Sequence, residues 1–183
     1  AFLQSQPKYG LLTGSEVRSL ALAQMDITAQ SIVWDIGAGS GSVSIEAAQI
    51  ATSGTVYAVE MDPADHALIE QNARRCHVAN VRPILGKAPT ALADLPDPDS
   101  VFVAGAGREV RRVAEAAFDR LQPGGRLVVN LISPDHLSEL RTALQQKCDR
   151  VDTWMVNIAR GTDQLGQLTF EPLKPSFLLA ATK

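Results

Sequence analysis

Short apolar runs alternate with amphipathic stretches along most of the chain. Five stretches carry apolar side chains at helical spacing, at residues 13–25, 43–50, 62–76, 111–121 and 135–147. Seven runs have the length and the β-branched content of strands, at residues 32–36, 55–59, 81–85, 100–104, 127–130, 151–161 and 177–181. The pattern predicts an α/β fold: a seven-stranded, mostly parallel sheet between helices, whose last two strands form a C-terminal antiparallel hairpin.

Turn and cap residues mark the ends of several elements. Thr13 is expected to cap the first helix, and Glu16 would complete a capping box with it. Asp62 followed by Pro63 predicts the start of the third helix. Two segments carry no regular pattern, so residues 1–12 are expected to form a polar lead and residues 162–175 a polar loop.

Composition narrows the functional classes. The 183 residues suit a single domain, and the scarcity of aromatic residues (5%) beside a 45% hydrophobic content suits helices packed on a parallel sheet. A net charge of −3 argues against a nucleic-acid partner. Cys76 and Cys148 are far apart, and neither they nor the three scattered histidines show the spacing of metal ligands. Two distant cysteines are expected to be free thiols in a reducing compartment, the cytoplasm. No apolar run is long enough to span a membrane.

Residues 35–41 read Asp-Ile-Gly-Ala-Gly-Ser-Gly and join the first strand to the next helix. Glycines at alternate positions allow a sharp turn and let a ligand approach bare Cα atoms, in front of a helix N terminus. A dinucleotide-binding loop needs Gly or Ala where this chain has Ser42. Glu60 closes the second strand about 20 residues later, where its carboxylate can accept hydrogen bonds from both ribose hydroxyls. The spacing indicates a nucleoside-type cofactor.

This D-x-G-x-G-x-G pattern resembles the first motif of class I methyltransferases, which use S-adenosylmethionine. The resemblance implies their three-layer, Rossmann-like fold, with the glycine loop at the methionine end of the cofactor. Many members carry an acidic residue after the third strand, whereas this chain has Lys87 there, which leaves the backbone N–H of Ala88 to contact adenine. The cofactor-binding residues expected on this basis are Thr13, Asp35, Gly37, Ala38, Gly39, Gly41, Glu60, Met61, Lys87, Ala88 and Ala104.

Three further segments resemble a narrower family, the decarboxylating precorrin carbon-15 methyltransferases of cobalamin biosynthesis. They are residues 12–18 (Leu-Thr-Gly-Ser-Glu-Val-Arg), 105–107 (Gly-Ala-Gly) and 157–161 (Asn-Ile-Ala-Arg-Gly), and the likeness extends over residues 9–183. The resemblance implies methylation of carbon 15 of a precorrin-6B-type tetrapyrrole, together with loss of the acetate carboxyl group on ring C as carbon dioxide.

The substrate implied by this resemblance carries several carboxylates, which call for charged partners. Arg160 and Arg108 are expected at the mouth of the site, with Gly105 and Gly107 leaving room for a flat substrate after the fourth strand. Arg18 and Lys8 lie in the segment before the first strand, where residues 9–13 are candidates to fold over the cofactor. No general base stands out, and Glu109 and Asp135 are candidates by location alone.

The resemblance also implies partners. The chain is expected to be fused to, or to work with, a precorrin carbon-5 methyltransferase domain, and to form a homo-oligomer, with a tetramer as the expected state. Two alternatives stay open: a class I methyltransferase that acts on RNA or protein, and a nucleotide-binding module without catalysis. The Gly105–Gly107 loop argues against methylation of a nucleic-acid amine, because enzymes of that kind commonly carry an acidic or amide residue and two prolines there.

Overall fold

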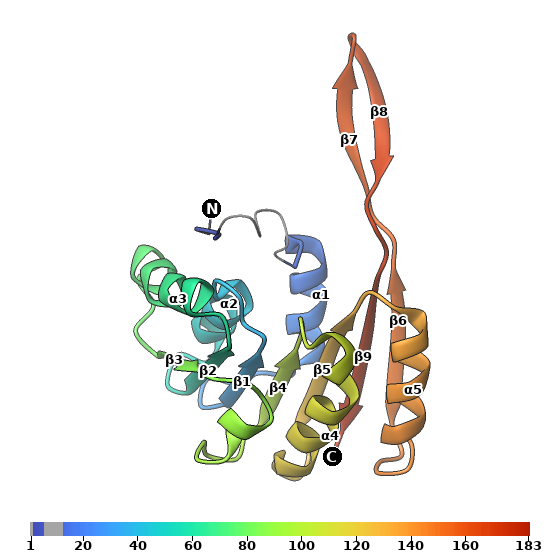
Figure 1. The fold of residues 1–183 in the computed structure, drawn as a ribbon. Coiled ribbons are helices and arrows are strands. Elements are labelled where there is room, and N and C mark those ends of the chain that lie inside the picture. The colour runs from blue at the N-terminus through green and yellow to red at the C-terminus, as the bar shows by residue number, and fades with distance from the viewer. Residues whose placement is uncertain (1, 6–12) are drawn as a thin grey trace.

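A seven-stranded sheet forms the middle layer of the computed structural model, which describes residues 2–5 and 13–183 (Figure 1). The strand order is β3-β2-β1-β4-β5-β9-β6, and neighbours are parallel except the two pairs made by β9. The strands are β1 (Ile32–Ile36), β2 (Thr55–Glu60), β3 (Val81–Leu85), β4 (Ser100–Val103), β5 (Arg126–Leu131), β6 (Val151–Val156) and β9 (Ser176–Thr182). The predicted sheet is confirmed, including its antiparallel C-terminal part.

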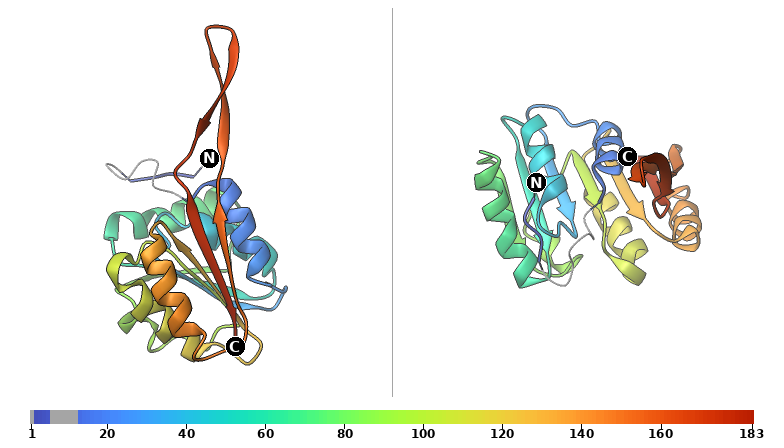
Figure 2. Two further views of the ribbon diagram at one scale, coloured as in Figure 1. Left: turned by 90° about the vertical axis from the view of Figure 1, so that its right-hand side faces the viewer. Right: turned by 90° about the horizontal axis from the view of Figure 1, so that it is seen from above.

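Helices cover both faces of the sheet, which makes three layers (Figures 1 and 2). One face is covered by α1 (Ser15–Gln24), α2 (Ser42–Ile50) and α3 (Pro63–Arg75), the other by α4 (Val110–Arg120) and α5 (Pro134–Leu144). Single helical turns, η1 (Thr90–Leu92) and η2 (Gly107–Glu109), complete this part of the chain.

Alternation along the central strands divides the core in two. In β5, Val128 packs in the cluster under α1 and α2, whereas the next residue, Val129, packs in the cluster under α4 and α5. All four residues of β4 are buried, as expected for a parallel strand covered on both faces. Burying each Val or Leu side chain contributes roughly 1.5–3 kcal/mol.

The strand order reverses between β1 and β4, so the loops that follow these strands leave the sheet side by side. The amide of Ala104 donates to the carbonyl of Ile36 over 2.9 Å and keeps the two loops together. In open α/β sheets, ligands bind outside the carboxyl ends of the strands at such a switch point. We call this rim of the sheet the carboxyl edge.

Two predictions about the C-terminal region are wrong. Residues 151–161 do not form one strand, because the chain leaves the sheet after Val156 and starts a new strand, β7 (Ala159–Gln164). Residues 162–175 are not a loop, because β7 pairs with β8 (Gln167–Pro172) in a separate two-stranded sheet. A two-residue turn at Leu165 and Gly166, both with positive φ, reverses the chain there.

This β7–β8 hairpin, which we call the arm, projects beyond the carboxyl edge (Figures 1 and 2). Its two faces differ. Thr162 and Thr169 pair on the polar face, with hydroxyl oxygens 3.1 Å apart. Leu168 and Phe170 lie on the opposite face and are 71% and 66% exposed. Nothing in the described part of the chain covers this apolar face.

Cap predictions had mixed outcomes. Asp62 caps α3 as expected, and its Oδ1 accepts from the amide of Ala64 at 2.8 Å. The prediction of a capping box at α1 is wrong, because Gly14 takes the N-cap position and makes no side-chain cap bond.

Within the described ranges, no helix is both long enough and apolar enough to cross a bilayer.

Candidate functional site

The first two glycines of the 35–41 loop have different structural roles. Gly37 (φ +76°) lies so close to β4 that an added Cβ would stand 2.0 Å from the carbonyl oxygen of Ala104. Gly39 (φ +56°) has nothing within 4 Å of such a Cβ. Gly37 therefore packs two loops together, whereas Gly39 presents bare backbone toward open space, as a ligand cradle requires.

The rest of the loop is fixed by backbone hydrogen bonds and one side chain. The amides of Gly37 and Ala38 both donate to the carbonyl of Val59, at 2.9 and 3.1 Å. Gly41 has φ +88° and stands at the N-cap of α2. Asn72 of α3 donates from its side chain to the carbonyl of Ser40 at 2.9 Å.

Glu60 lies at the end of β2, and its side chain joins two backbone segments. One carboxylate oxygen accepts from the amide of Gly39 and the other from the amide of Asp62, both at 2.8 Å. Each oxygen retains acceptor capacity, because a carboxylate offers about four lone-pair sites. The group is therefore held rigidly beside the glycine loop and can still accept from two hydroxyls.

Asp35 does not line the carboxyl edge. Its side chain is buried between β1 and α2, where Oδ2 accepts from the hydroxyl of Ser44. Burial, helped by the negative charge of Glu60 and opposed by the hydrogen bonds from Ser44, raises the pKa of this carboxyl from an ordinary value of 3.8 to about 6. Its Oδ1 is buried without a hydrogen-bond partner in the described part of the chain. Any effect of Asp35 on a ligand is exerted through the loop above it.

The side chains next to the loop suit an adenosine. Met61 directly follows β2 and Leu85 is the last residue of the neighbouring β3; they are 65% and 54% exposed, so both offer apolar surface to a base. Ala88 is half-buried in the turn after β3, whereas Lys87 makes an ion pair with Glu109 at 3.0 Å. A carboxylate acceptor beside bare glycine backbone, flanked by apolar side chains, is an arrangement that fits S-adenosylmethionine.

Glycines also leave the loop after β4 open. An added Cβ at Gly105 (φ +65°) would meet only the carbonyl oxygen of Gly37, at 3.9 Å, and at Gly107 (φ +52°) it would meet nothing within 4 Å. Arg108 follows in η2 and is exposed, and no described residue pairs with it. The predicted loop residues therefore lie beside the predicted cofactor-binding residues at the same edge.

Of the other predicted basic residues, Arg160 lies at the base of the arm and Arg18 is buried. Arg160 is 61% exposed and makes an ion pair with Glu16 of α1 at 3.1 Å. Arg18 binds Glu46 with two nitrogens and donates a third bond to the carbonyl of Thr13, so each of its three guanidinium nitrogens already makes a hydrogen bond. Residues 8–12, with Lys8 and most of the proposed cover, lie outside the described residues.

Three polar residues that matter here were missed by sequence reasoning. Asn72 fixes the loop and also exchanges two hydrogen bonds with the backbone of Leu3. Ser44 is the partner of Asp35. Asn130 stands near the end of β5 inside an apolar run, and its Oδ1 is buried with no partner among the residues described. A lone amide in such a run was the available signal.

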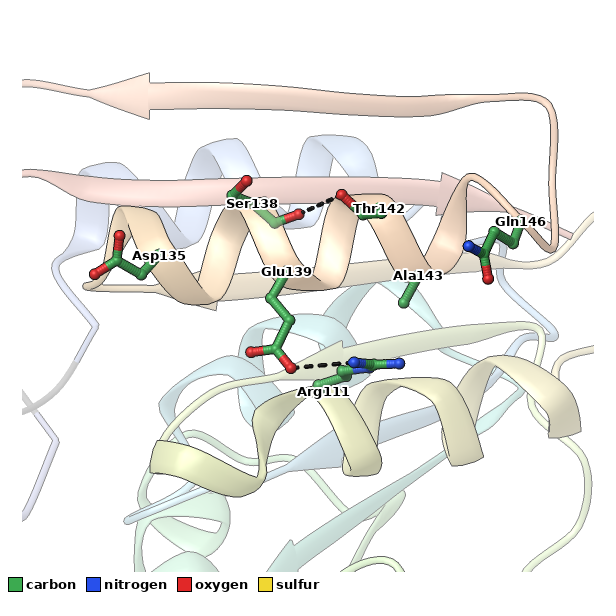
Figure 3. A pocket seen from close by; sticks show the side chains of 7 residues that line it. All are labelled: Arg111, Asp135, Ser138, Glu139, Thr142, Ala143 and Gln146. Atoms are coloured by element: carbon green, nitrogen blue, oxygen red, sulfur yellow. Dashed lines mark hydrogen bonds and ion pairs between the residues drawn. The ribbon is translucent and has the colours of Figure 1, made fainter.

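A surface hollow lies on another part of the molecule. An open groove of about 550 Å³ runs along the outer side of α4 and α5 (Figure 3). Arg111 and Glu139, which face each other across it, are 3.1 Å apart in an ion pair. The groove contains none of the glycine-loop residues, so its size alone gives no reason to place chemistry there.

Comparison with known proteins gives a consistent result. A family model described as "Precorrin methyltransferase domain" matches residues 6–183. A cobalt-precorrin-6B C(15)-methyltransferase (decarboxylating) of Salmonella typhi is 34% identical over 94% of this chain and 89% of its own length. A precorrin-6Y C(5,15)-methyltransferase [decarboxylating] of a Sinorhizobium species is 40% identical over 69% of this chain, which spans only 30% of that longer protein. A crystal structure of precorrin-6y C5,15-methyltransferase from Geobacter metallireducens superposes with a TM-score of 0.91, at 32% identity, over 100% of this chain and 95% of that one.

Proposed function

This chain belongs to the precorrin methyltransferase family, and on that basis we propose that it methylates carbon 15 of a precorrin-6B-type tetrapyrrole and removes the acetate carboxyl group on ring C. The observation that carries the proposal is the family match over residues 6–183, which includes every element of the carboxyl edge. We propose S-adenosylmethionine as the cofactor, which supplies an electrophilic methyl group on a sulfonium.

Different residues along the carboxyl edge would bind different parts of the cofactor and the tetrapyrrole. Glu60 is placed to hold the ribose, and Met61 with Leu85 to contact the base. Gly39 leaves room for the methionine part of the cofactor. Gly105 and Gly107 leave the adjoining space to the tetrapyrrole. Methyl transfer of this kind depends on in-line positioning more than on a strong base.

The same site can serve both steps. The bridging carbon is conjugated with ring nitrogens and is an enamine-like nucleophile. Loss of carbon dioxide from the neighbouring acetate releases an electron pair into the same conjugated system. Neither step requires a protein base. Glu109, one candidate by location, is held in an ion pair by Lys87, which lowers the pKa of its carboxyl.

The proposed reaction is tested by incubating the chain with precorrin-6B, in metal-free and cobalt-containing forms, and with deuterium-labelled methyl donor. Mass spectrometry is expected to find a product with one labelled methyl group and without one carbon dioxide. Parallel incubations with RNA and with cell-extract protein test the alternative acceptors. Label in either of those, with none in the tetrapyrrole, would contradict the proposal.

We also propose that the chain works as a homo-oligomer, with a tetramer as the expected state. The support is the arm: a two-stranded ribbon is marginally stable alone, and this one exposes Leu168 and Phe170 on one face. A second copy of the same arm offers a matching apolar face.

The Sinorhizobium relative, whose name covers both carbon 5 and carbon 15, supports a carbon-5 methyltransferase as working partner. Free Cys76 and Cys148 are consistent with the cytoplasm.

The assembly is tested by measuring the mass in solution by light scattering. Phe170→Glu places a charge on the apolar face and is expected to reduce the mass to that of a smaller species. Gln167→Glu on the polar face is the matched control and is expected to leave the mass unchanged. A wild-type monomer, or equal effects of the two variants, would contradict the proposal.

A further inference from the structure

Asn130 occupies a position that points to the methyl acceptor rather than the cofactor. It lies two residues after Val128, so its side chain is on the face of β5 that is covered by α1. Val129 pairs with Val103 of β4, which places Asn130 beside Ala104, at the start of the Gly105–Gly107 loop. The cofactor residues stand on the other side of that loop, on β1 and β2.

The surroundings of Asn130 are formed by the elements expected around the substrate. The hydroxyl of Ser100, at the amino end of β4, donates to the carbonyl of Met25 at the end of α1. The helix therefore runs back along the sheet, and its first turn lies at the carboxyl edge. Glu16 in that turn pairs with Arg160 at the base of the arm. Asn130 thus lies at the same edge of the sheet as the β4 loop and the first turn of α1.

The side chain of Asn130 is chemically incomplete within the chain. Its Oδ1 is one of three buried side-chain atoms without a hydrogen-bond partner in the described ranges, and the other two are in Asp35 and Ser40 of the glycine loop. Buried polar atoms are nearly always bonded, so an exception calls for an explanation. By contrast, Asn80 donates its amide hydrogens to the carbonyls of Ala48 and Ala51 and is satisfied inside the fold.

We propose that the half-buried side chain of Asn130 turns its Oδ1, buried in the free protein, toward the bound tetrapyrrole, where the oxygen accepts a hydrogen bond from a ring N–H. This inference rests on the proposed function. Such a substrate carries carboxylates, which only accept, so its ring N–H groups are the donors that match an unpartnered carbonyl oxygen. The bond would hold the bridging carbon in line with the methyl donor.

The same bond would favour the reaction electronically. As the new carbon–carbon bond forms from the enamine electron pair, the sulfur–methyl bond breaks and its pair stays on sulfur. The positive charge passes from the sulfonium to the conjugated ring nitrogen. A fixed carbonyl oxygen on that N–H is an acceptor aimed at charge that develops in the transition state. Asn130 would therefore act on turnover as well as on binding.

The test compares Asn130→Leu with wild type in three measurements: melting temperature, cofactor affinity by calorimetry, and initial rates with precorrin-6B. Asn130→Leu is expected to melt no lower than wild type, because an unsatisfied amide is replaced by an apolar group. Cofactor affinity is expected to stay unchanged, while kcat/KM for the tetrapyrrole falls roughly 100-fold. Asn130→Asp, which retains an acceptor oxygen, is expected to keep more activity than Asn130→Leu.

Asn80→Leu is the matched control and is expected to lower the melting temperature without changing the rate per folded molecule. Asn130→Ala replaces Asn130→Leu if the larger side chain prevents folding. Wild-type turnover retained in Asn130→Leu or Asn130→Ala would overturn the assignment of Asn130 alone. Wild type inactive on the tetrapyrrole would overturn the proposed function itself. Equal losses in Asn130→Asp and Asn130→Leu would overturn the role of Oδ1 as acceptor.

Discussion

The two halves of the carboxyl edge are built from contacts of different range. On the cofactor half, at β1 and β2, Glu60 binds the amide of Gly39, only 21 positions away. On the acceptor half, at β4, β5 and the arm, Arg160 reaches Glu16 across 144 positions. On the cofactor half, hydrogen bonds from Glu60 and Asn72 hold the glycine loop in place. The acceptor half keeps exposed charges, exposed apolar groups such as Ile132 (85% exposed) and the unpartnered Oδ1 of Asn130.

This contrast fits the ligand that we propose for each half. A cofactor of constant shape can be bound by a rigid loop that lies within one β-α-β unit. A large flat acceptor needs contributions from several elements, which only the tertiary fold brings together. Variants that damage one half and spare the other are therefore the natural way to test the division.

The largest effect is expected from two neighbouring glycines of the cofactor half. Gly37→Ala drives a Cβ into the carbonyl of Ala104 and is expected to lower the free energy of unfolding by roughly 3–5 kcal/mol, measured by urea titration. Gly39→Ala meets no atom and is expected to cost only about 1–2 kcal/mol while weakening cofactor binding. Gly39→Val would abolish binding. Equal losses of stability in the two alanine variants would contradict these roles.

The next effect concerns the ribose. Glu60→Ala removes a charged acceptor from two hydroxyls, at about 1.5–3 kcal/mol per bond, so cofactor affinity is expected to fall roughly 100-fold or more. Calorimetry on the folded variant measures it. Glu70→Ala, which removes an exposed carboxylate of α3, is the control and should bind normally. Unchanged affinity in Glu60→Ala would remove this residue from the site.

Arg160 tests the acceptor half. Arg160→Ala is expected to lose a few kcal/mol of tetrapyrrole recognition and most turnover, because an arginine is withdrawn from a partly desolvated carboxylate, while cofactor affinity is kept. Arg160→Lys should rescue only in part, since an ammonium cannot make the two-pronged contact. Stability should hardly change, because exposed ion pairs contribute little.

Glu16→Gln is the matched control for Arg160, since it breaks the same ion pair and leaves the arginine in place. Steady-state kinetics should show near wild-type turnover in Glu16→Gln. Equal losses in Glu16→Gln and Arg160→Ala would mean that Arg160 only attaches the arm to α1.

The smallest effect is a pH dependence of stability from Asp35. Its pKa of about 6 lies above the ordinary value of 3.8, so the folded protein holds more protons than the unfolded chain between those pH values. Stability from this group is therefore present at low pH and is lost as pH rises through about 6, on the order of 2–3 kcal/mol. Asp35→Asn should lack that loss when urea unfolding is measured between pH 4 and 7. Parallel pH profiles would contradict the buried, raised-pKa carboxyl.

Sequence reasoning predicted the glycine turn, the position of Glu60 and much of the fold because their signals are local. The glycine spacing, the strand that ends at Glu60 and the Asp62 cap each lie within a few residues of the structure they specify. The seven-stranded sheet followed from the same periodicity.

Sequence reasoning failed where local and tertiary signals differ. The arm reads as a polar loop because one of its faces is polar throughout, and its pairing depends on a turn at Leu165 and Gly166 that lacks the usual Asn-Gly or Asp-Gly pair. Thr13 suggested a cap, yet the chain starts α1 from Gly14. Arg18 seemed available for a substrate, but Glu46, which binds it, is 28 positions away. A role for Asn130 could be inferred only from the loop and the helix at the same edge of the sheet, which the sequence does not place beside it.

The division of the edge is tested most directly by titrating both ligands into the same three proteins: wild type, Glu60→Ala and Arg160→Ala. Binding of S-adenosylmethionine and of precorrin-6B, the latter with S-adenosylhomocysteine present, would be measured by calorimetry. We predict a crossed pattern, in which Glu60→Ala loses cofactor affinity and Arg160→Ala loses tetrapyrrole affinity, each sparing the other ligand. A folded variant that loses both affinities together, or a wild-type protein that does not bind the tetrapyrrole, would contradict the account.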